Sequence, residues 1–341
     1  MRVIQVIDTL AIGGGEQVLV DITKILANRE VDVDVLCLTK LGSKSEELKG
    51  ICDVTSLSRT SKFSIVKMYQ LYNRLKQYDI IHCHFRHVFR YVKLVGKIFS
   101  LKGNVILHDH YGKIDVNKKI PFGFNLMKVE NYIGVSETLT KWSQKNLNPV
   151  NNLLLPNIII KSNNTQKLDR RFEFICIGNI KPTKNQMFAA KIAKNLNNSI
   201  LFIGAQQDIN YTKELVTFCN EMKLDYLILS NIKYAQDYIK NANVALHTAV
   251  TETGPLVLIE YMAHQLPFLC YNTGEVAKNL LKELPELVLN SFEVEDWLSY
   301  YQSLKNNKAI DEKLSSIFNS NYSEESYFTS LIDFYEKILN E

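Results

Sequence analysis

Residues 161–171 read KSNNTQKLDRR, and residues 172–178 directly after them read FEFICIG. The first segment is polar and has no apolar period, which is typical of a linker. The second is a short apolar run that stops at a glycine, which is typical of a buried strand. The pattern therefore indicates that one folding unit ends near residue 160 and that another begins at residue 172.

On both sides of this junction, short apolar runs alternate with segments of helical periodicity. The expected strands cover residues 3–7, 31–38, 80–84, 105–107, 132–135, 153–155, 172–177, 200–204, 226–229, 244–247 and 268–271. The expected helices include residues 63–76, 86–100, 186–196 and 211–222, and a first helix that carries Val18, Ile22, Ile25 and Leu26 at helical spacing. The run at 31–38 alternates Val with Asp at its start, as a strand near a sheet edge does. Strands that alternate with helices predict parallel sheets covered on both faces.

Two such series predict an α/β fold with two doubly wound, Rossmann-like domains. The length of 341 residues suits this number. We expect an N-terminal domain over residues 1–160, a linker over 161–171 and a C-terminal domain over 172–323. A last helix, residues 324–341, could pack on either domain, and we expect it to return to the first.

The bulk composition is that of a soluble globular protein, with 46% hydrophobic and 22% charged residues. The first apolar run is too short for a secretory signal, and no run approaches the roughly 20 apolar residues of a membrane helix. The six cysteines are scattered and form no CxxC pair. We therefore expect reduced thiols and a cytoplasmic protein.

Positive charge is concentrated in the first half of the chain. Residues 1–160 carry 22 Lys and Arg against 14 Asp and Glu, and residues 59–128 alone carry 14 against 3. This excess predicts an anionic partner, either a phosphorylated acceptor or an acidic membrane surface. Nucleic acid is not the expected partner, because no recognised binding module accompanies the charge.

Four cations in this region share one face of an expected helix, since Arg86, Arg90, Lys93 and Lys97 follow one another at spacings of four, three and four residues. They form either a solvated outer face or a surface that docks on an anionic membrane leaflet. In the second case the acceptor would be lipid-linked.

Three loops that follow expected strands could hold a ligand, because ligands of such sheets bind beyond the carboxyl ends of the strands. The first loop contains Gly13, Gly14 and Gly15. It is a tight turn or an anion site at a helix N-terminus. It is not the dinucleotide fingerprint, whose third glycine would fall at Val18, and an oxidoreductase is disfavoured for that reason.

The second loop runs from Gly178 and Asn179 to Lys181 and Lys184. Its lysines are either solvated or placed to neutralise a diphosphate.

The third loop, residues 251–260, reads TETGPLVLIE. Pro255 is suited to the first position of a helix, and the N–H groups of Gly254, Leu256 and Val257 could bind a phosphate or a sugar. Glu252 precedes this helix, and Glu260 lies within an otherwise apolar run. A carboxylate is costly to bury there unless it is hydrogen-bonded, and sugar or ribose hydroxyls would supply the donors.

The third loop resembles the Glu-x7-Glu signature of retaining GT-B glycosyltransferases, specifically glycosyltransferase family 4. Residues 13–16 (GGGE), 79–85 (DIIHCHF), 132–137 (YIGVSE), 155–157 (LPN) and 262–267 (MAHQLP) resemble other segments of that family in the expected order. The resemblance covers nearly the whole chain. It implies the GT-B architecture, in which two Rossmann-like domains face each other across a cleft. It also implies sugar transfer from a nucleotide-sugar donor, UDP-linked ones leading, with retention of configuration.

By this resemblance, Glu260 binds the ribose, Glu252 contacts hydroxyls of the transferred sugar and Lys184 balances the leaving diphosphate. His108 is the histidine that faces the donor sugar, with His110 as the alternative. The other implied donor-site residues are Gly14, Gly15, Gly178, Asn179, Gly254, Pro255 and Leu256. The acceptor would be a glycan or a lipid-linked glycan in surface-polysaccharide assembly.

The chain departs from the family pattern at Asn179, where an Arg is common, and at Gln265, where a Gly is common. Asn179 supplies no positive charge, so Lys181 or Lys184 must do more. Two alternatives stay open: a nucleotide-sugar 2-epimerase, which can use a similar two-domain fold, and a non-catalytic partner subunit, which the Asn179 departure favours.

No metal or other cofactor is expected. The resemblance implies metal-independent chemistry, and the sequence shows no Asp-x-Asp motif. His82 and His84 would share a face of a strand, with His87 close by, but zinc-ligand spacings are absent.

Overall fold

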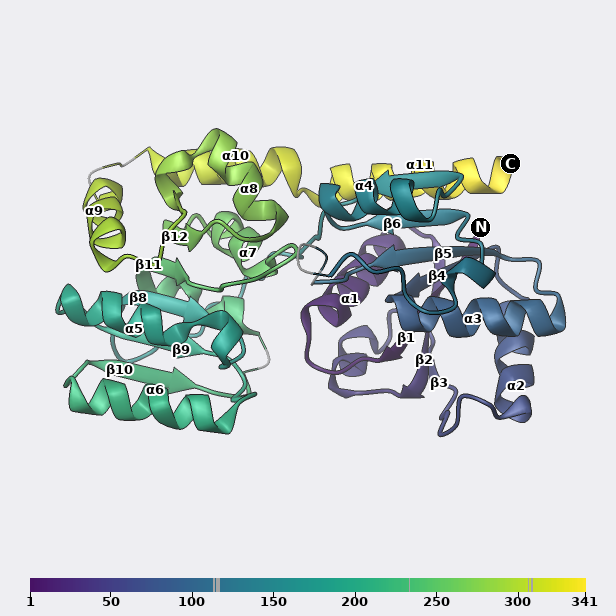
Figure 1. Cartoon of the computed structure of the whole chain (residues 1–341), viewed down its shortest axis with the longest axis horizontal. Coiled ribbons are helices and arrows are strands. Elements are labelled where there is room, and N and C mark those ends of the chain that lie inside the picture. The colour runs from purple at the N-terminus through teal and green to yellow at the C-terminus, as the bar shows by residue number, and fades with distance from the viewer. Residues whose placement is uncertain (113, 115–116, 233, 306, 308) are drawn as a thin grey trace. The chain divides into compact units, whose positions relative to one another are not determined.

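The structure, a computed structural model, describes residues 1–112, 114, 117–232, 234–305, 307 and 309–341. The chain divides into two compact units (Figure 1). The first unit comprises Met1–Ile159 together with Ser323–Glu341, and the second comprises Ile160–Tyr322.

The first unit is built on a parallel sheet with the strand order β3-β2-β1-β4-β5-β6-β7. Its strands are β1 (Arg2–Thr9), β2 (Asp32–Lys40), β3 (Val54–Ser56), β4 (Ile80–His84), β5 (Asn104–Asp109), β6 (Asn131–Gly134) and β7 (Asn151–Leu154). The order reverses between β1 and β4, so the sheet is doubly wound, and sheets of this kind bind ligands beyond the carboxyl ends of the strands at the reversal. The strand expected near an edge, β2, lies second from it, beside the short β3.

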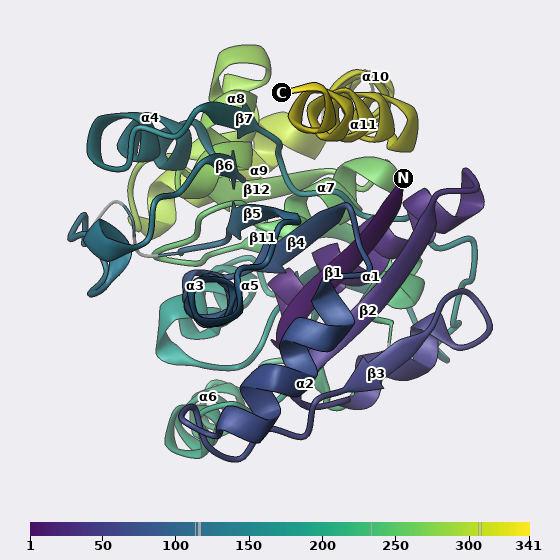
Figure 2. The same ribbon diagram turned by 90° about the vertical axis from the view of Figure 1, so that its right-hand side faces the viewer.

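Helices cover both faces of this sheet (Figure 2). They are α1 (Gly14–Asn28), α2 (Ile65–Leu75), α3 (Arg86–Phe99), α4 (Glu137–Asn146) and α11 (Glu324–Asn340), with 3-10 turns η1 (Ser43–Leu48) and η2 (Phe124–Leu126). The α2 and α3 helices lie on one face, and α1 and α11 lie on the other. Serine side chains cap several of these helices; Ser64, for example, accepts a hydrogen bond from the Lys67 amide, so α2 starts at Ile65 rather than at residue 63.

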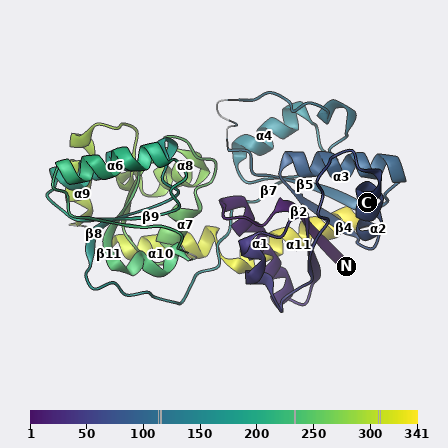
Figure 3. The ribbon, with the colours of Figure 1, turned by 90° about the horizontal axis from the view of Figure 1, so that it is seen from below.

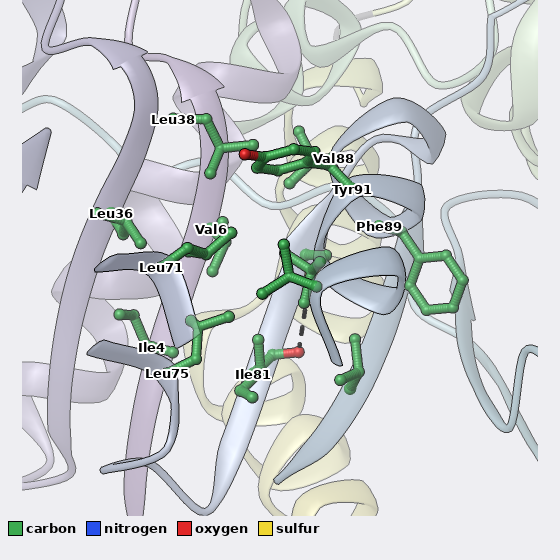
Figure 4. Packing of buried hydrophobic residues seen from close by; sticks show 14 of the residues in the cluster. Ile4, Val6, Leu36, Leu38, Leu71, Leu75, Ile81, Val88, Phe89 and Tyr91 are labelled. Atoms are coloured by element: carbon green, nitrogen blue, oxygen red, sulfur yellow. Dashed lines mark hydrogen bonds between the residues drawn. The ribbon is translucent and has the colours of Figure 1, made fainter. Parts of the chain in front are cut away.

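The core under α2 and α3 takes alternate residues from each strand. Ile4 and Val6 of β1 and Ile81 of β4 pack with Leu71 and Leu75 of α2 (Figure 4). Successive side chains of a strand point to opposite faces. The residues between these positions therefore face α1 and α11, and several of them are polar.

The second unit repeats the architecture with the strand order β10-β9-β8-β11-β12-β13, again all parallel. Its strands are β8 (Phe172–Ile177), β9 (Ile200–Ile203), β10 (Tyr226–Leu229), β11 (Ala242–His247), β12 (Phe268–Tyr271) and β13 (Val288–Leu289). The order reverses between β8 and β11. These two strands are nearly continuous apolar runs, as expected when helices cover both faces of a parallel sheet.

The helices of the second unit also form two layers, with α6 and α10 on opposite sides of β8 and β9 (Figure 3). They are α5 (Gln186–Asn195), α6 (Ile209–Glu221), α7 (Leu256–Ala263), α8 (Gly274–Glu283), α9 (Val294–Lys305) and α10 (Ile310–Asn321), with 3-10 turns η3 (Pro182–Lys184), η4 (Ala235–Asn241) and η5 (Pro285–Leu287).

The structure confirms the predicted fold class of two doubly wound α/β units, and each expected strand overlaps a strand of the structure. The short strands β3 and β13 were not predicted. Within the described part of the chain, no helix combines the length and the apolar character required to span a membrane.

Candidate functional site

The strongest candidate site lies at the strand-order reversal of the second sheet, where the loops after β8 and β11 meet. Gly178, which follows β8, has a φ of 153°. A Cβ atom at Gly204, after β9, would lie only 2.1 Å from the Gly178 carbonyl oxygen. A glycine at position 204 therefore lets the ends of β8 and β9 approach closely. This close approach fixes the path of the loop that follows Gly178.

Hydrogen bonds fix this loop to the loop after β11. The Thr248 hydroxyl donates to the carbonyl oxygens of Asn185 at 2.9 Å and of Lys184 at 3.2 Å. The Val250 amide donates to the Thr183 carbonyl at 2.9 Å. Asn185 itself is in the left-handed conformation, with a φ of 52°. The backbone of Lys184 is thereby held beside the loop that carries Glu252.

Lys184 and Glu252 form an ion pair, and both side chains are mostly buried, with exposed fractions of 23% and 18%. The ring of His247, at the end of β11, lies 3.8 Å from the same carboxylate oxygen and is 3% exposed. The backbone amide of Glu252 donates to the Thr273 hydroxyl oxygen at 3.0 Å. The predicted pair is thus brought together, and the two sides of the reversal are joined by a charge pair.

The ionisation state of this cluster follows from its contacts. Burial alone would raise the pKa of Glu252, but the charge of Lys184 and the contact with His247 outweigh it and lower the pKa to about 2. Burial lowers the pKa of His247, and Glu252 opposes this only in part. At neutral pH, Glu252 is a carboxylate that can only accept hydrogen bonds, and His247 is neutral.

The start of α7 carries further residues that were predicted to bind the donor. The helix begins at Leu256, so Pro255 precedes the helix, and the expectation that it is the first helical residue was wrong by one position. Gly254 comes immediately before it, and Glu260 lies on α7 with a partly exposed side chain. Asn179 lies in the loop after β8, where the buried Gln186 amide donates to its carbonyl at 3.0 Å.

Sequence reasoning did not single out His247, Thr248, Thr273 or Gln186. Their signal was positional: His247 and Thr248 stand where a predicted strand ends, beside the strand-order reversal. Thr273 follows β12, and Gln186 opens α5. Because the order of strands in a sheet cannot be read from local sequence, these strand ends could not be recognised as neighbours.

In the first unit, the glycine loop has a packing explanation. The α1 helix begins at Gly14. A Cβ atom at Gly15 would lie 2.4 Å from the Phe85 ring, which follows β4. Gly15 therefore admits that ring at the reversal between β1 and β4. A role of Gly14 and Gly15 in donor binding stays a prediction.

The two histidines considered for the donor-facing position differ in exposure. His108, on β5, is fully buried, whereas His110, two residues beyond it, is partly exposed. His108 Nδ1 lies 2.9 Å from His82 Nε2, and His110 Nε2 lies 3.1 Å from His84 Nδ1. The exposure favours His110, the alternative assignment, for contact with a substrate.

The expected basic stripe on α3 is not a free surface. Arg86 is buried, lies 2.7 Å from Asp109 and stacks on Tyr111 and Trp142. Lys93 lies 3.5 Å from Glu130. Arg90 donates to the Phe122 carbonyl at 2.8 Å, and Lys97 donates to the Leu126 carbonyl. The prediction that these four cations form one solvent-facing stripe is therefore wrong for Arg86, whereas Arg90 and Lys93 are partly exposed and Lys97 is exposed.

Two further features bear on the choice of site. The ring nitrogens of His82, His84 and His108 lie within 4.8 Å of one another, which is a spacing that a metal ion could accept. The expectation of a metal-free protein stays a prediction.

A cavity of about 380 Å³ lies at the amino ends of β11 and β12, lined in part by Arg171, Lys240 and Asp311. Lys184 and Glu252, in contrast, lie beyond the carboxyl ends of the strands of this sheet.

Family models match both halves of the chain. Residues 12–145 match "Glycosyltransferase Family 4", and residues 158–320 match "Glycosyl transferases group 1". No curated protein matches the sequence significantly.

Solved structures share the fold at low sequence identity. Anabaena Alr3699/HepE in complex with UDP is similar over 99% of this chain and 100% of its own, with a TM-score of 0.82 and 13% identity. A glycosyltransferase from Rickettsia africae ESF-5 is similar over 99% of this chain and 98% of its own, with a TM-score of 0.79 and 13% identity. The apo form of the lipopolysaccharide outer core galactosyltransferase WaaB is similar over 100% of this chain and 98% of its own, with a TM-score of 0.64 and 16% identity.

Proposed function

Because glycosyltransferase family models match both of its halves, the chain belongs to the GT-B glycosyltransferases, and from that premise we propose a specific reaction. The protein transfers a sugar from a UDP-linked donor to a glycan or lipid-linked glycan, with retention of configuration and without a metal ion. Similar structures support the choice of nucleotide, since those of Alr3699/HepE contain UDP, or UDP-glucose.

The observation that carries this proposal is the Lys184–Glu252 pair at the strand-order reversal of the second sheet. Cleavage of the bond between the anomeric carbon and the diphosphate builds negative charge on the leaving group. The ammonium of Lys184 and the N–H groups at the start of α7, near Gly254 and Leu256, stabilise that charge. Losing one such preorganised donor typically slows a reaction by about 10²–10³.

The two carboxylates then act as acceptors for hydroxyl groups. Glu252 stays ionised because its pKa is held at about 2, so it binds hydroxyls of the transferred sugar. Glu260, on α7, binds the ribose. Both roles need a carboxylate that is fixed before the ligand arrives. For Glu252 this is provided by Lys184, by His247 and by its backbone bond to Thr273.

Asn179 shapes this mechanism because it brings no charge to the loop after β8. Its carbonyl is held by Gln186, so its backbone is positioned while its side chain cannot stabilise an anion by charge. Lys184, with Lys181 in the same loop, then supplies the positive charge for the diphosphate. The same substitution is the observation that favours the second candidate, a non-catalytic partner subunit.

In the first unit, we assign the contact with the donor sugar to His110, because His108 is fully buried. Acceptor binding also falls to this unit, which carries the excess of positive charge. Surface-polysaccharide or lipid-linked glycan assembly on the cytoplasmic side of the membrane is the proposed pathway. The similarity to WaaB, whose name describes a lipopolysaccharide galactosyltransferase, is consistent with it.

The test is a product assay with purified protein, a panel of UDP-sugars and EDTA. Time-resolved NMR of the anomeric proton in the presence of an acceptor should give the α-linked product from an α-linked donor. Inversion at the anomeric carbon would overturn retention, and a strict need for a divalent ion would overturn metal independence. A new UDP-sugar formed without an acceptor would identify an epimerase.

Contact with the membrane is a separate part of the proposal. Exposed apolar side chains gather near the segment that Arg90 and Lys97 hold: Phe122 is 92% exposed and Leu126 is 71% exposed. Such residues enter a lipid interface while neighbouring lysines bind anionic headgroups. We expect the protein to float with liposomes that contain anionic lipid, and Phe122→Asp to reduce this. Equal flotation of both proteins, or none by the wild type, would remove this part.

A further inference from the structure

Three buried histidines in the first unit, His82, His84 and His108, and the partly exposed His110 form a hydrogen-bonded cluster with Gln5 and Tyr335 that the proposed reaction does not explain. Parallel pairing aligns Gln5 with His82 and His84 with His108 across β1, β4 and β5. All of these side chains point to the sheet face opposite the α2–α3 core, which α11 covers. The cluster is therefore a direct consequence of strand alternation and register.

Each hydrogen bond between residues of neighbouring strands runs diagonally, to the residue two positions beyond the paired one. Gln5 Oε1 lies 2.7 Å from His84 Nε2, and His84 Nδ1 lies 3.1 Å from His110 Nε2. In a second chain, the Tyr335 hydroxyl lies 2.5 Å from His82 Nδ1. His82 Nε2 lies 2.9 Å from His108 Nδ1. Two chains thus run side by side, and only the first reaches a partly exposed residue.

The first chain determines where the protons lie. An amide oxygen can only accept, so the N–H of His84 must be on Nε2, and His84 Nδ1 is bare. A bare Nδ1 in turn accepts the N–H of His110 from its Nε2. The Nδ1 atom of His110 is then left with a free lone pair. Burial lowers the pKa of His84 well below its usual value and that of His110 to about 3, so both rings carry a single proton at neutral pH.

We propose that Gln5 and His84 are positioning residues, which hold His110 in the tautomer whose Nδ1 accepts a hydrogen bond from a hydroxyl group of the sugar substrate. This inference rests on the proposed function for the identity of the substrate. A misplaced proton would turn His110 Nδ1 from an acceptor into a donor. The ground-state structure would change little, but the contact with the hydroxyl would be lost.

The second chain is the internal control, because it ends at the buried Nε2 of His108, for which the described part of the structure provides no hydrogen-bond partner. Tyr335→Phe removes the hydroxyl of this chain, which also contacts the Gln5 side chain, and leaves the Gln5–His84 and His84–His110 hydrogen bonds in place. The cluster is therefore assigned as a proton-ordering network, since His82 Nε2 and His108 Nδ1 are hydrogen-bonded to each other at 2.9 Å.

The experiment measures the tautomer of His110 directly. Full-length protein labelled with 15N-histidine is studied at pH 7 by multiple-bond 1H–15N NMR, with His110→Asn identifying the signal. The expected spectrum has the proton on Nε2 in the wild type and in Tyr335→Phe, and a mixture of tautomers in Gln5→Leu. A proton on Nδ1 in the wild type, which a reversed Gln5 amide would produce, overturns the proposal whether or not any variant folds.

Kinetics supply the second readout. Gln5→Leu should lower kcat by about 10-fold with less than a two-fold change in the KM for the donor. Tyr335→Phe, which leaves the Gln5–His84 and His84–His110 hydrogen bonds in place, should retain kcat. Zinc bound one to one to the purified protein, and lost in His84→Asn, would show a metal site and overturn the proposal.

The outcomes separate this inference from the proposed function. A wild type with the expected tautomer that transfers no sugar would remove the proposed function and leave the proton order of the network standing. A wild type that transfers sugar, with Gln5→Leu equal to it in tautomer and kcat, would remove the network and leave the function standing.

Discussion

Replacing Lys184 with alanine removes the cationic partner of Glu252 and leaves that carboxylate in a site where it is only 18% exposed. The change has two consequences of different origin. The leaving diphosphate loses an ammonium group. In the protein without ligand, the mostly buried Glu252 carboxylate keeps its contact with His247 but loses the positive charge that stabilised it. Both consequences can be given a magnitude.

For stability, the pKa of Glu252 is about 2, against an ordinary value of 4.5. At about 1.4 kcal/mol per pH unit, the folded state favours the carboxylate by about 3 kcal/mol. Since the folded pKa is the lower one, this stabilisation is complete above pH 4.5 and is lost as the pH falls toward 2. In Lys184→Ala, burial is left as the dominant influence and raises the pKa of Glu252, so this acid-dependent contribution should disappear.

The assay combines calorimetric unfolding with a measurement of released UDP. At pH 7, Lys184→Ala should lower Tm by about 6–12 °C and reduce kcat by about 10²–10³. Lys181→Ala, which removes a lysine from the same loop, should change Tm little. The double variant Lys184→Met/Glu252→Gln should regain most of the stability and none of the activity. An unchanged Tm together with wild-type kcat in Lys184→Ala would refute the reasoning.

Three further variants probe the remaining claims. Gly15→Ala should destabilise the protein by about 1–3 kcal/mol, because its Cβ would lie 2.4 Å from the Phe85 ring, and Phe85→Leu should relieve this; urea unfolding without any loss would contradict it. Arg86→Met should cost about 3–5 kcal/mol in the same assay, because Asp109 is 1% exposed and loses its charge partner; a loss below 1 kcal/mol would make Arg86 the surface cation expected from the sequence. Glu260→Ala should weaken UDP binding by about 10-fold in titration calorimetry, and unchanged affinity would remove its ribose role.

The fold could be predicted because its signals are local and repeated. Apolar runs such as residues 80–84 and 172–177 are long enough to mark strands, and the polar segment 161–171 marks the junction. The β3 and β13 strands were missed because runs of two or three residues carry no period. The predicted first residues of α2 and α7 differ from the observed ones because capping and proline geometry, rather than apolar spacing, determine where a helix begins.

The candidate site could be predicted only in part. Lys184 and Glu252 stand in recognisable loops, but their contact depends on β8 and β11 being neighbours, and strand order is not a local property. The prediction for Arg86 on α3 was wrong for a related reason. Helical spacing gives the face of α3 that Arg86 occupies, whereas its burial follows from its ion pair with Asp109 on β5. His247 was missed because a histidine at the end of a strand has no distinctive sequence context.

The most direct test of the central claim is the response of Tm to a panel of nucleotide sugars in EDTA, followed by detection of the released nucleotide. We predict that one UDP-sugar raises the Tm of the wild type, that Glu260→Ala loses the increase and that UDP is released in the presence of an acceptor. If no nucleotide sugar raises Tm and no nucleotide is released, the protein is not a transferase, and Asn179 becomes the first position to change.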